Sequence, residues 1–200
     1  MGRLISLVIG YCFGCFLTAE VVARLHTGKS AAQLGTGKPG MANISSPLGW
    51  RWGALVLLGD IAKTAVACAL AVLLTREPLA VLYAGFGTTL GHNFPFWIKF
   101  RGGKGVATTC TSLVLFHPIA GGLCCLAGLA VTLITGWLPL GAVVIPALFI
   151  PLAFKLWGPE AGLLAVLSTL MMISRHFLGL KRIVRGEEHK VFRHETEPPI

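Results

Sequence analysis

The segment Ala54–Leu74 reads ALVLLGDIAKTAVACALAVLL and contains only two charged side chains. A helix needs roughly 20 mostly apolar residues to cross a bilayer, so this segment predicts a transmembrane helix. The whole chain has the same character, because 54% of its 200 residues are hydrophobic and 12% are charged. Soluble domains carry about 25% charged residues. We therefore exclude a soluble globular protein and expect a polytopic membrane protein.

Six further apolar segments are bounded by polar or helix-breaking residues, with Lys155–Glu160 separating the last two. They are Leu4–Val22, Leu79–Ile98, Val106–Phe116, Ile119–Thr135, Leu138–Phe154 and Ala161–Ile173. Unpaired backbone groups are costly in lipid, so each segment should be helical. We expect a single all-α membrane domain over residues 1–200 with about seven spans. Because Val106–Phe116 is short for a crossing, five spans are the alternative.

Lysine and arginine are concentrated in three segments, 24–51, 99–105 and 175–193, which hold thirteen of the 17 such residues. With seven spans these segments fall on one face of the membrane, and a five-span chain has the same sidedness. The positive-inside rule makes that face cytoplasmic, with the N-terminus outside and the C-terminus in the cytoplasm. The net charge of +9 then reflects membrane orientation, and we expect no nucleic-acid partner.

The second basic segment combines cations with glycines, reading KFRGGKGV over residues 99–106. A helix that starts near Val106 would present free N–H groups and partial positive charge at this point. Glycines let a backbone approach an anion closely. The segment predicts a phosphate-binding site formed by Lys99, Arg101, Gly102, Gly103, Lys104 and Gly105.

The first basic segment is also glycine-rich and reads GTGKPG over residues 35–40. Its glycine spacing matches a dinucleotide motif, but the flanking strand and helix of that fold are missing. The same backbone chemistry still suits a phosphate group, and a flexible connector is the alternative. We expect a second part of the site from Gly35, Thr36, Gly37, Lys38, Gly40 and Asn43.

Polar residues at the span ends complete the candidate site. His92 lies near the end of one apolar segment. It is either functional, as a proton carrier or a hydrogen-bond donor to phosphate, or a hydrogen-bonded structural histidine. Arg175 and His176 lie where the last span reaches the same face. Inside a span, Asp60 and Lys63 are three residues apart and share a helix face, which predicts a supporting pair. The histidines lack metal-ligand spacing, so we expect neither a metal nor another cofactor.

The stretch from Gly91 to Thr108, GHNFPFWIKFRGGKGVAT, resembles a motif of the bacterial acyl-phosphate:glycerol-3-phosphate acyltransferases, the PlsY family. The resemblance extends to Asp60-x-x-Lys63 and Arg175-His176 and covers nearly the whole chain. It implies a seven-helix protein of the bacterial inner membrane with its site at the cytoplasmic face. It also implies transfer of a fatty acyl group from acyl phosphate to glycerol 3-phosphate, which gives lysophosphatidic acid and phosphate for phospholipid biosynthesis.

The chain departs from this family pattern in its first and third motifs. Lys38 stands where the family has asparagine, Cys15 where it usually has serine, and Ser46 where it has arginine. On the resemblance we assign His92, His176 and Lys104 as catalytic residues and Arg175 as a phosphate ligand. The departures leave a second interpretation open. The chain would then be an altered or inactive paralogue that binds a phosphate-bearing lipid precursor or partners another membrane enzyme.

Overall fold

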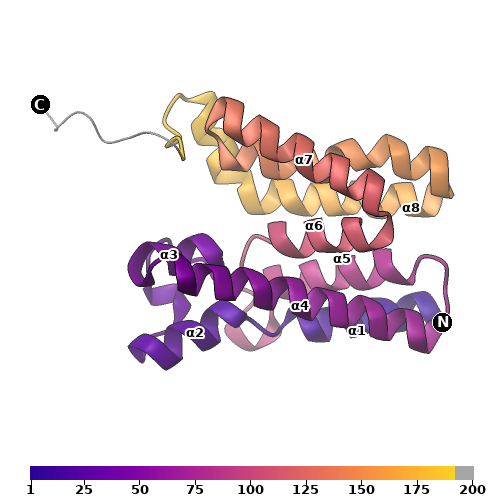
Figure 1. Ribbon diagram of the computed structural model, residues 1–200, viewed down its shortest axis with the longest axis horizontal. Helices are drawn as coiled ribbons and strands as arrows, with labels where there is room; N and C mark the ends of the chain where they lie inside the picture. Colours follow the sequence, from indigo (N-terminus) through magenta and orange to yellow (C-terminus); the bar gives the residue numbers. More distant parts are fainter. Residues whose placement is uncertain (192–200) are drawn as a thin grey trace, which may run out of the picture.

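The computed structural model describes residues 1–191, and the regular secondary structure within them is helical. The helices are α1 (Gly2–Gly14), α2 (Thr18–Thr27), α3 (Met41–Leu48), α4 (Trp50–Thr75), α5 (Ala80–Asn93), α6 (Val106–Phe116), α7 (Pro118–Thr135) and α8 (Leu138–Val184). Two short 3-10 turns, Ala31–Gln33 and Phe96–Ile98, lie in the loops. Figure 1 shows α7 and α8 on one side of the bundle, α1 and α4 on the other, and α5 and α6 between them. The all-helical prediction is confirmed.

Helix α8 consists of two arms that meet at Gly158, where φ is 85° and ψ is −178°. This backbone conformation is essentially restricted to glycine, and it reverses the chain. The second arm then packs along the first, since a side chain on Gly179 would overlap Pro139 and one on Gly162 would overlap Phe154. The expected separation of the last two apolar segments is therefore found. The second arm, however, continues past the predicted end at Ile173 to Val184.

The predicted continuous helix Leu4–Val22 is wrong, because the chain breaks between α1 and α2. The carbonyl oxygens freed by the break accept hydrogen bonds from distant side chains. Trp97 Nε1 donates to the Cys15 oxygen at 2.8 Å, and Lys63 Nζ donates to the Phe16 oxygen at 2.8 Å. Such donors satisfy the backbone where the helix stops. The apolar pattern of the segment carries no sign of them.

The predicted helix Leu79–Ile98 also ends early, at Asn93. Pro95 explains this, because proline has no N–H to donate and disfavours helical backbone at the residue before it. In contrast, the predicted segment Val106–Phe116 coincides with α6.

Helices α1 and α5 approach very closely through glycines. A side chain on Gly10 would overlap the carbonyl of Ala84, and one on Gly91 would overlap the carbonyl of Tyr11. Small residues allow such contact, and van der Waals packing drives helix association where the solvent is itself apolar. This packing fixes the end of α5 that carries His92.

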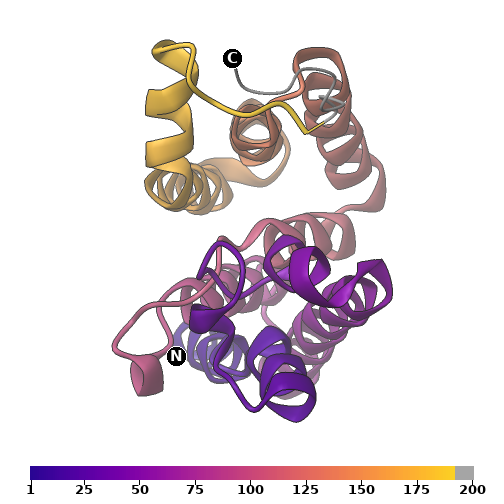
Figure 2. The same ribbon diagram turned by 90° about the vertical axis from the view of Figure 1, so that its left-hand side faces the viewer.

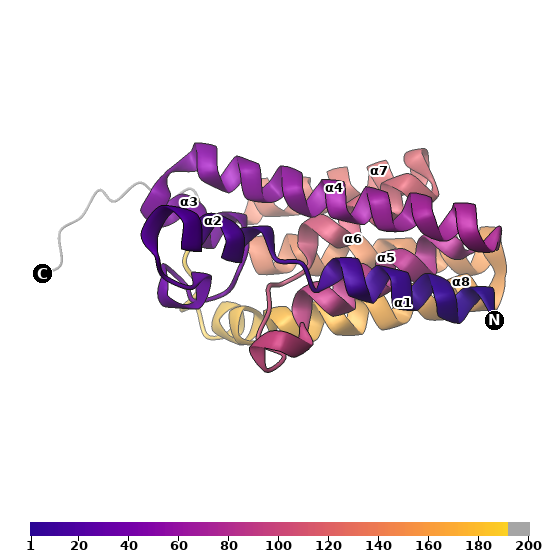
Figure 3. The same cartoon turned by 90° about the horizontal axis from the view of Figure 1, so that it is seen from below.

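Within the described residues, the stretches Gly2–Thr27, Trp50–Thr75, Pro118–Thr135 and Leu138–Val184 are long and apolar enough to cross a membrane. The first of these includes the break between α1 and α2. Large apolar side chains remain exposed along their outer faces, such as Ile119, Leu126 and Ile134 on α7. In Figure 3 these long helices run side by side along the same axis. The structure thus has the lipid-facing surface of an integral membrane protein.

Candidate active site

The three basic segments meet at one end of the bundle. Figure 1 shows α2, α3 and the last turns of α8 at this end, and Figure 2 views the molecule from it. The third segment is described here only to residue 191, so Arg193 lies outside the described residues. Helix α6 begins further inside the bundle than the neighbouring ends of α4 and α7 (Figure 1). Its N-terminus is therefore recessed behind the loops.

The loop before α6 is held in place through the peptide groups of Gly102 and Gly103. Gly102 N–H donates to the Asn93 oxygen at 3.0 Å, and Gly103 N–H donates to the His92 oxygen at 2.9 Å. Arg175 donates from Nη2 to the Gly102 oxygen at 2.7 Å and from Nε to the Gly103 oxygen at 2.9 Å. The expectation that these two N–H groups face an anion is thus wrong, because the end of α5 already occupies them. Gly102 and Gly103 therefore hold the loop against α5 and Arg175.

Gly103 is also the point where the first and second basic segments touch. A side chain there would overlap His92 Nε2 and the carbonyl oxygen of Pro39. The contact between Pro39 and Gly103 brings the adjacent Lys38 and Lys104 into one region. Only glycine allows the two loops to meet in this way.

The recessed start of α6 has free hydrogen-bonding capacity. Its N-cap is Gly105, with φ of 78° and no side-chain cap, so the first N–H groups of the helix have no intrahelical partner. Asn93 lies beside Gly105 and is fully buried, and neither of its side-chain amide atoms has a hydrogen-bond partner among residues 1–191. Buried polar groups are normally paired, so this environment suits a polar ligand.

His176 contributes a second unpartnered atom. Its side chain is 2% exposed, and its Nδ1 lies 3.1 Å from the Met172 oxygen. A carbonyl can only accept, so the ring proton is assigned to Nδ1. The buried Nε2 then presents a lone pair that has no hydrogen-bond partner in the described part of the chain. Lys104 and Lys38 act electrostatically on this ring, which places His176 at the same cluster.

Four cations gather around this region. Burial lowers the pKa of Lys104, and the charge of Lys38 lowers it further. Burial also lowers the pKa of Lys38, with further contributions from Arg175 and Arg182. One carboxylate, Glu188, acts on Lys104 and lies 2.5 Å from Arg182 Nε. We call Lys38, Lys104, Arg175 and Arg182 the cation cluster, and its excess positive charge favours anionic ligands.

The first glycine segment forms a loop whose shape depends on Asn43. Asn43 is buried, and its Oδ1 accepts from Gly37 N–H at 3.0 Å and from Thr36 Oγ1 at 3.2 Å. Gly35 and Gly37 have φ values of 46° and 70°, which favour glycine. Gly37 N–H is thus engaged within the loop that carries Lys38, and the direct phosphate contacts expected of Gly35 and Gly37 stay a prediction.

Three other predicted residues lie at the edge of the site. Gly40 is the N-cap of α3, and nothing lies within 4 Å of where its side chain would be. Lys99 and Arg101 are exposed on the turn that precedes Gly102. In the described part of the chain, neither of these two charges is among those that act on Lys38 or Lys104. The structure does not bring these three residues together with the cation cluster.

The predicted pair Asp60 and Lys63 lies behind the glycine loop. Lys63 Nζ is 2.8 Å from Asp60 Oδ1 and 2.9 Å from His92 Nδ1. All three side chains are buried, at 4%, 7% and 4% exposure respectively for Asp60, Lys63 and His92. The pair thus connects directly to a residue of the candidate site.

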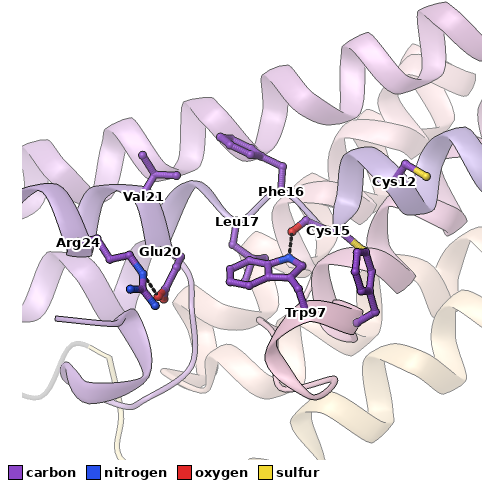
Figure 4. Close-up of a pocket in the computed structure, with 9 residues that line it drawn as sticks. Cys12, Cys15, Phe16, Leu17, Glu20, Val21, Arg24 and Trp97 are labelled. Carbon is purple, nitrogen blue, oxygen red and sulfur yellow. Dashed lines mark hydrogen bonds and ion pairs between the residues drawn. The ribbon is translucent and has the colours of Figure 1, made fainter. Parts of the chain in front are cut away.

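A cavity of about 470 Å³ lies on the other side of Lys63, at the break between α1 and α2. Figure 4 shows Trp97 and Leu17 facing it, with Arg24 and Glu20 paired at its edge. Its walls are mostly apolar. Its lining residues are Cys12, Cys15, Phe16, Leu17, Glu20, Val21, Arg24, Phe96 and Trp97.

Sequence reasoning overlooked two residues of the site. Asn93 was hidden between the recognisable His92 and Pro95, although an amide at the end of an apolar segment is itself unusual. Arg182 is one of several cations in the segment 175–193, and its residue type alone does not distinguish it. Its spacing of seven residues from Arg175 places both on one helix face, which is the signal that could have found it.

Fold and site together define an all-helical membrane protein with a recessed cationic site for anionic ligands. A family model described as glycerol-3-phosphate acyltransferase matches residues 4–186. Glycerol-3-phosphate acyltransferase 1 of Lactobacillus johnsonii is 38% identical over 179 residues, covering 86% of this chain and 84% of that protein. Glycerol-3-phosphate acyltransferase of Caulobacter vibrioides is 35% identical, covering 98% and 92%. This chain belongs to the glycerol-3-phosphate acyltransferase family, as the resemblance of its motifs predicts.

Solved structures agree with this assignment. The crystal structure of PlsY (YgiH), an integral membrane glycerol 3-phosphate acyltransferase, in its glycerol 3-phosphate form has a TM-score of 0.82 and 26% identity to this chain. The match covers 95% of this chain and 96% of that one. The lysophosphatidic acid form of PlsY has the same fold, with a TM-score of 0.81. The integral membrane fold is therefore shared.

Proposed function

We propose that this protein transfers a fatty acyl group from acyl phosphate to glycerol 3-phosphate, giving lysophosphatidic acid and inorganic phosphate. The observation that carries the proposal is the convergence of Lys38, Lys104 and Arg175 beside the free N-terminus of α6. The family membership supports it, as does the similar PlsY structure in its glycerol 3-phosphate form.

The proposed chemistry needs no covalent intermediate on the protein. Acyl phosphate is already activated, so the 1-hydroxyl of glycerol 3-phosphate attacks the carbonyl carbon and the bond to the phosphate oxygen breaks. The hydroxyl proton leaves with the phosphate product or passes to solvent. The protein has to orient two phosphate-bearing molecules and stabilise developing negative charge. Among the described residues, the cluster places four cations beside one carboxylate, Glu188, and this excess of positive charge suits two anionic substrates.

Individual roles follow from the free atoms of the site. Lys104 and the first N–H groups of α6 would bind phosphate oxygens, with Lys38 beside them. The unpartnered Nε2 of His176 is placed to accept a hydrogen bond from the attacking hydroxyl. Arg175 has donors left after its two bonds to the loop, because a guanidinium has five N–H groups. His92 supports this site from behind the loop.

The same proposal includes the membrane orientation. The chain forms one membrane domain of seven spans, namely α1, α4, α5, α6, α7 and the two arms of α8. The end that bears the three basic segments faces the bacterial cytoplasm. The opposite end carries fewer cations, and one of them, Arg3, pairs with Glu160, which also accepts a hydrogen bond from Tyr83 at 2.7 Å. Reporter fusions after Arg76 and after Arg185 test the orientation, with external and cytoplasmic signals expected, respectively.

Complementation tests the activity. A bacterial strain that lacks its own acyl-phosphate-dependent acyltransferase should grow when it expresses this protein. The Lys104→Met variant should not support growth, whereas Lys181→Met, an exposed change on α8, should do so. Absence of growth with correctly inserted wild-type protein contradicts the proposal. Retained binding of glycerol 3-phosphate in that case would favour the paralogue without activity.

A further inference from the structure

We propose that Lys63 is a positioning residue for the phosphate site, because it fixes the ring tautomer of His92 and ties the glycine loop to the break between α1 and α2. The functional consequence rests on the proposed acyl transfer. The tautomer itself does not, and it can be measured without activity.

The ammonium group of Lys63 has three close partners. It lies 2.8 Å from Asp60 Oδ1, 2.9 Å from His92 Nδ1 and 2.8 Å from the Phe16 oxygen. The Gly14 oxygen is further away, at 3.5 Å. Within 3 Å it has two hydrogen-bond partners, His92 Nδ1 and the Phe16 oxygen, and one ion-pair partner, Asp60. Its orientation is therefore determined by residues of three separate segments of the chain.

This arrangement decides where the ring proton of His92 lies. A lysine ammonium group can donate but cannot accept, so His92 Nδ1 must be the acceptor. The neutral ring then carries its proton on Nε2. The Nε2 side of the ring faces Gly103 and lies near the Pro39 oxygen. A proton on that side is attracted by the carbonyl, whereas a lone pair would be repelled by it.

The ring orientation in turn supports the phosphate site. The backbone oxygen of His92 accepts the Gly103 N–H, and the ring packs where a side chain on Gly103 would otherwise lie. If the ring rotated, the contact between Gly103 and Pro39 would open, and Lys104 and Lys38 would separate. Lys63 therefore influences phosphate binding through His92, without touching the ligand.

The same lysine also connects to the cavity shown in Figure 4. Its bond to the Phe16 oxygen and the bond from Trp97 to the Cys15 oxygen both stabilise the break in α1–α2. Trp97 belongs to the turn that leads into the glycine loop. Two bonds thus hold the break and the loop in one arrangement.

The alternative is a catalytic base at His92, with Asp60 and Lys63 as an ordinary buried ion pair. A base needs an accessible nitrogen, but Nδ1 of His92 is occupied by Lys63 and the side chain is 4% exposed. The two roles make different predictions for conservative variants, and this allows them to be separated.

The first experiment measures the tautomer directly by ¹⁵N NMR of histidine-labelled protein in lipid nanodiscs. The His92 resonances are assigned by their loss in His92→Asn. In the wild type we expect an unprotonated Nδ1 that accepts a hydrogen bond and a protonated Nε2. In the double variant Asp60→Asn/Lys63→Met we expect a mixture of tautomers. A wild-type ring with its proton on Nδ1, or an unchanged spectrum in the double variant, overturns the proposal.

The double variant also separates positioning from stability. Replacing both members of a buried ion pair avoids an unpaired charge and is often close to neutral for stability. We expect the thermal midpoint to stay near that of the wild type while the KM for glycerol 3-phosphate rises about tenfold, the effect of one lost hydrogen bond. An unchanged KM in a folded double variant contradicts the proposal. If wild-type protein shows no acyl transfer, the proposed function fails while the NMR result still decides the tautomer.

Two variants of His92 complete the test. Asparagine keeps an acceptor near the Nδ1 position for Lys63, whereas phenylalanine removes it. For a positioning role, both variants should keep kcat within about threefold of the wild type and raise the KM, by about tenfold or more in His92→Phe, which also leaves Lys63 without its acceptor. For a catalytic base, both variants should lose kcat to the same extent, and that outcome would exclude the positioning role.

Discussion

Arg175 Nε donates a hydrogen bond to the carbonyl oxygen of Gly103 at 2.9 Å, across 72 residues of sequence. The guanidinium also lies over the Phe94 ring, 5.0 Å from its centroid. The second arm of α8 thereby holds the loop that precedes α6. A single residue combines two tasks, since it fixes the backbone of the site and contributes positive charge to it.

Replacing Arg175 with Lys should separate these two tasks. Lysine keeps the positive charge but cannot bond two neighbouring carbonyls with a planar fork. We expect kcat/KM for glycerol 3-phosphate to fall about 10–100-fold, the loss of one or two charge-assisted hydrogen bonds. Steady-state kinetics of purified protein measure this. Arg185→Lys, at an exposed position after α8, is the matched control. Equal losses of kcat/KM in both variants would contradict a role for the two hydrogen bonds from Arg175 to the loop.

Gly103→Ala should disrupt the contact between the two glycine loops. Its new methyl group would overlap His92 Nε2 and the Pro39 oxygen. We expect activity to fall by at least about tenfold, because one of these groups has to move away from the site. Gly122→Ala on α7 adds a methyl group in open space and should leave activity unchanged. Full activity of Gly103→Ala in an acyl-transfer assay would show that the loops tolerate separation.

Phosphate binding should weaken at alkaline pH, and it should do so at a lower pH than the ordinary lysine pKa of 10.5 would predict. Burial and the charge of Lys38 lower the pKa of Lys104 below 10.5. As pH rises through this lowered value, Lys104 loses its proton in the folded protein and the KM for glycerol 3-phosphate should increase. Lys104→Arg retains its charge at these pH values, so its KM should stay flatter. Parallel profiles for both proteins would exclude Lys104 as the titrating group.

Whereas phosphate binding should weaken with rising pH, the free energy of unfolding should gain from deprotonation of Lys104. A lysine whose folded-state pKa lies below its unfolded value binds protons more weakly in the folded state. The stability penalty from Lys104 is present at neutral pH and diminishes as pH rises through the lowered pKa toward 10.5. Chemical unfolding of wild type and Lys104→Met across this range should show that the difference between their free energies of unfolding narrows as pH rises.

The reversal in α8 gives a prediction about the fold alone. Gly158 adopts φ of 85° and ψ of −178°, which other residues adopt only with strain. Gly158→Ala should lower the free energy of unfolding by about 1–3 kcal/mol without changing the KM. Thermal unfolding in nanodiscs tests this, with Gly122→Ala as the control. A stability equal to that control would show that the reversal does not depend on glycine.

Much of the fold could be predicted from the sequence because lipid imposes a simple rule, namely that apolar segments of sufficient length become helices. The start of α6 at Val106 follows from this rule together with the glycines before it. The break after Gly14 could not be predicted, since it depends on donors from Lys63 and Trp97 that lie far away in sequence. Side-chain hydrogen bonds of this kind leave no periodic pattern.

The candidate site shows the same division. Residue types and glycine density indicated a phosphate site, but not which backbone groups would be free. The N–H groups of Gly102 and Gly103 donate to carbonyl oxygens at the end of α5. These oxygens have no helical partner because Pro95 stops that helix. Asn93 enters the site because it is buried beside Gly105, and Arg182 enters it because the second arm of α8 brings its charge near Lys38 and Lys104. Their contribution is a property of the three-dimensional arrangement.

The two histidines illustrate how environment assigns different roles to one residue type. His92 accepts from Lys63 through Nδ1, whereas His176 donates through Nδ1 to the Met172 oxygen. The free nitrogens are therefore of opposite kind: a donor at His92 and an acceptor at His176. Only the acceptor suits an attacking hydroxyl, which is why we place His176 at the reacting end.

The central claim is that this chain couples acyl transfer to phosphate release at the cation cluster. Its most direct test is a single reaction with purified protein in lipid nanodiscs, long-chain acyl phosphate and glycerol 3-phosphate, in which both products are quantified. We expect lysophosphatidic acid and inorganic phosphate in equal amounts, both dependent on glycerol 3-phosphate and both lost in Lys104→Met. Phosphate release without lysophosphatidic acid, or neither product from well-folded protein, would contradict the account.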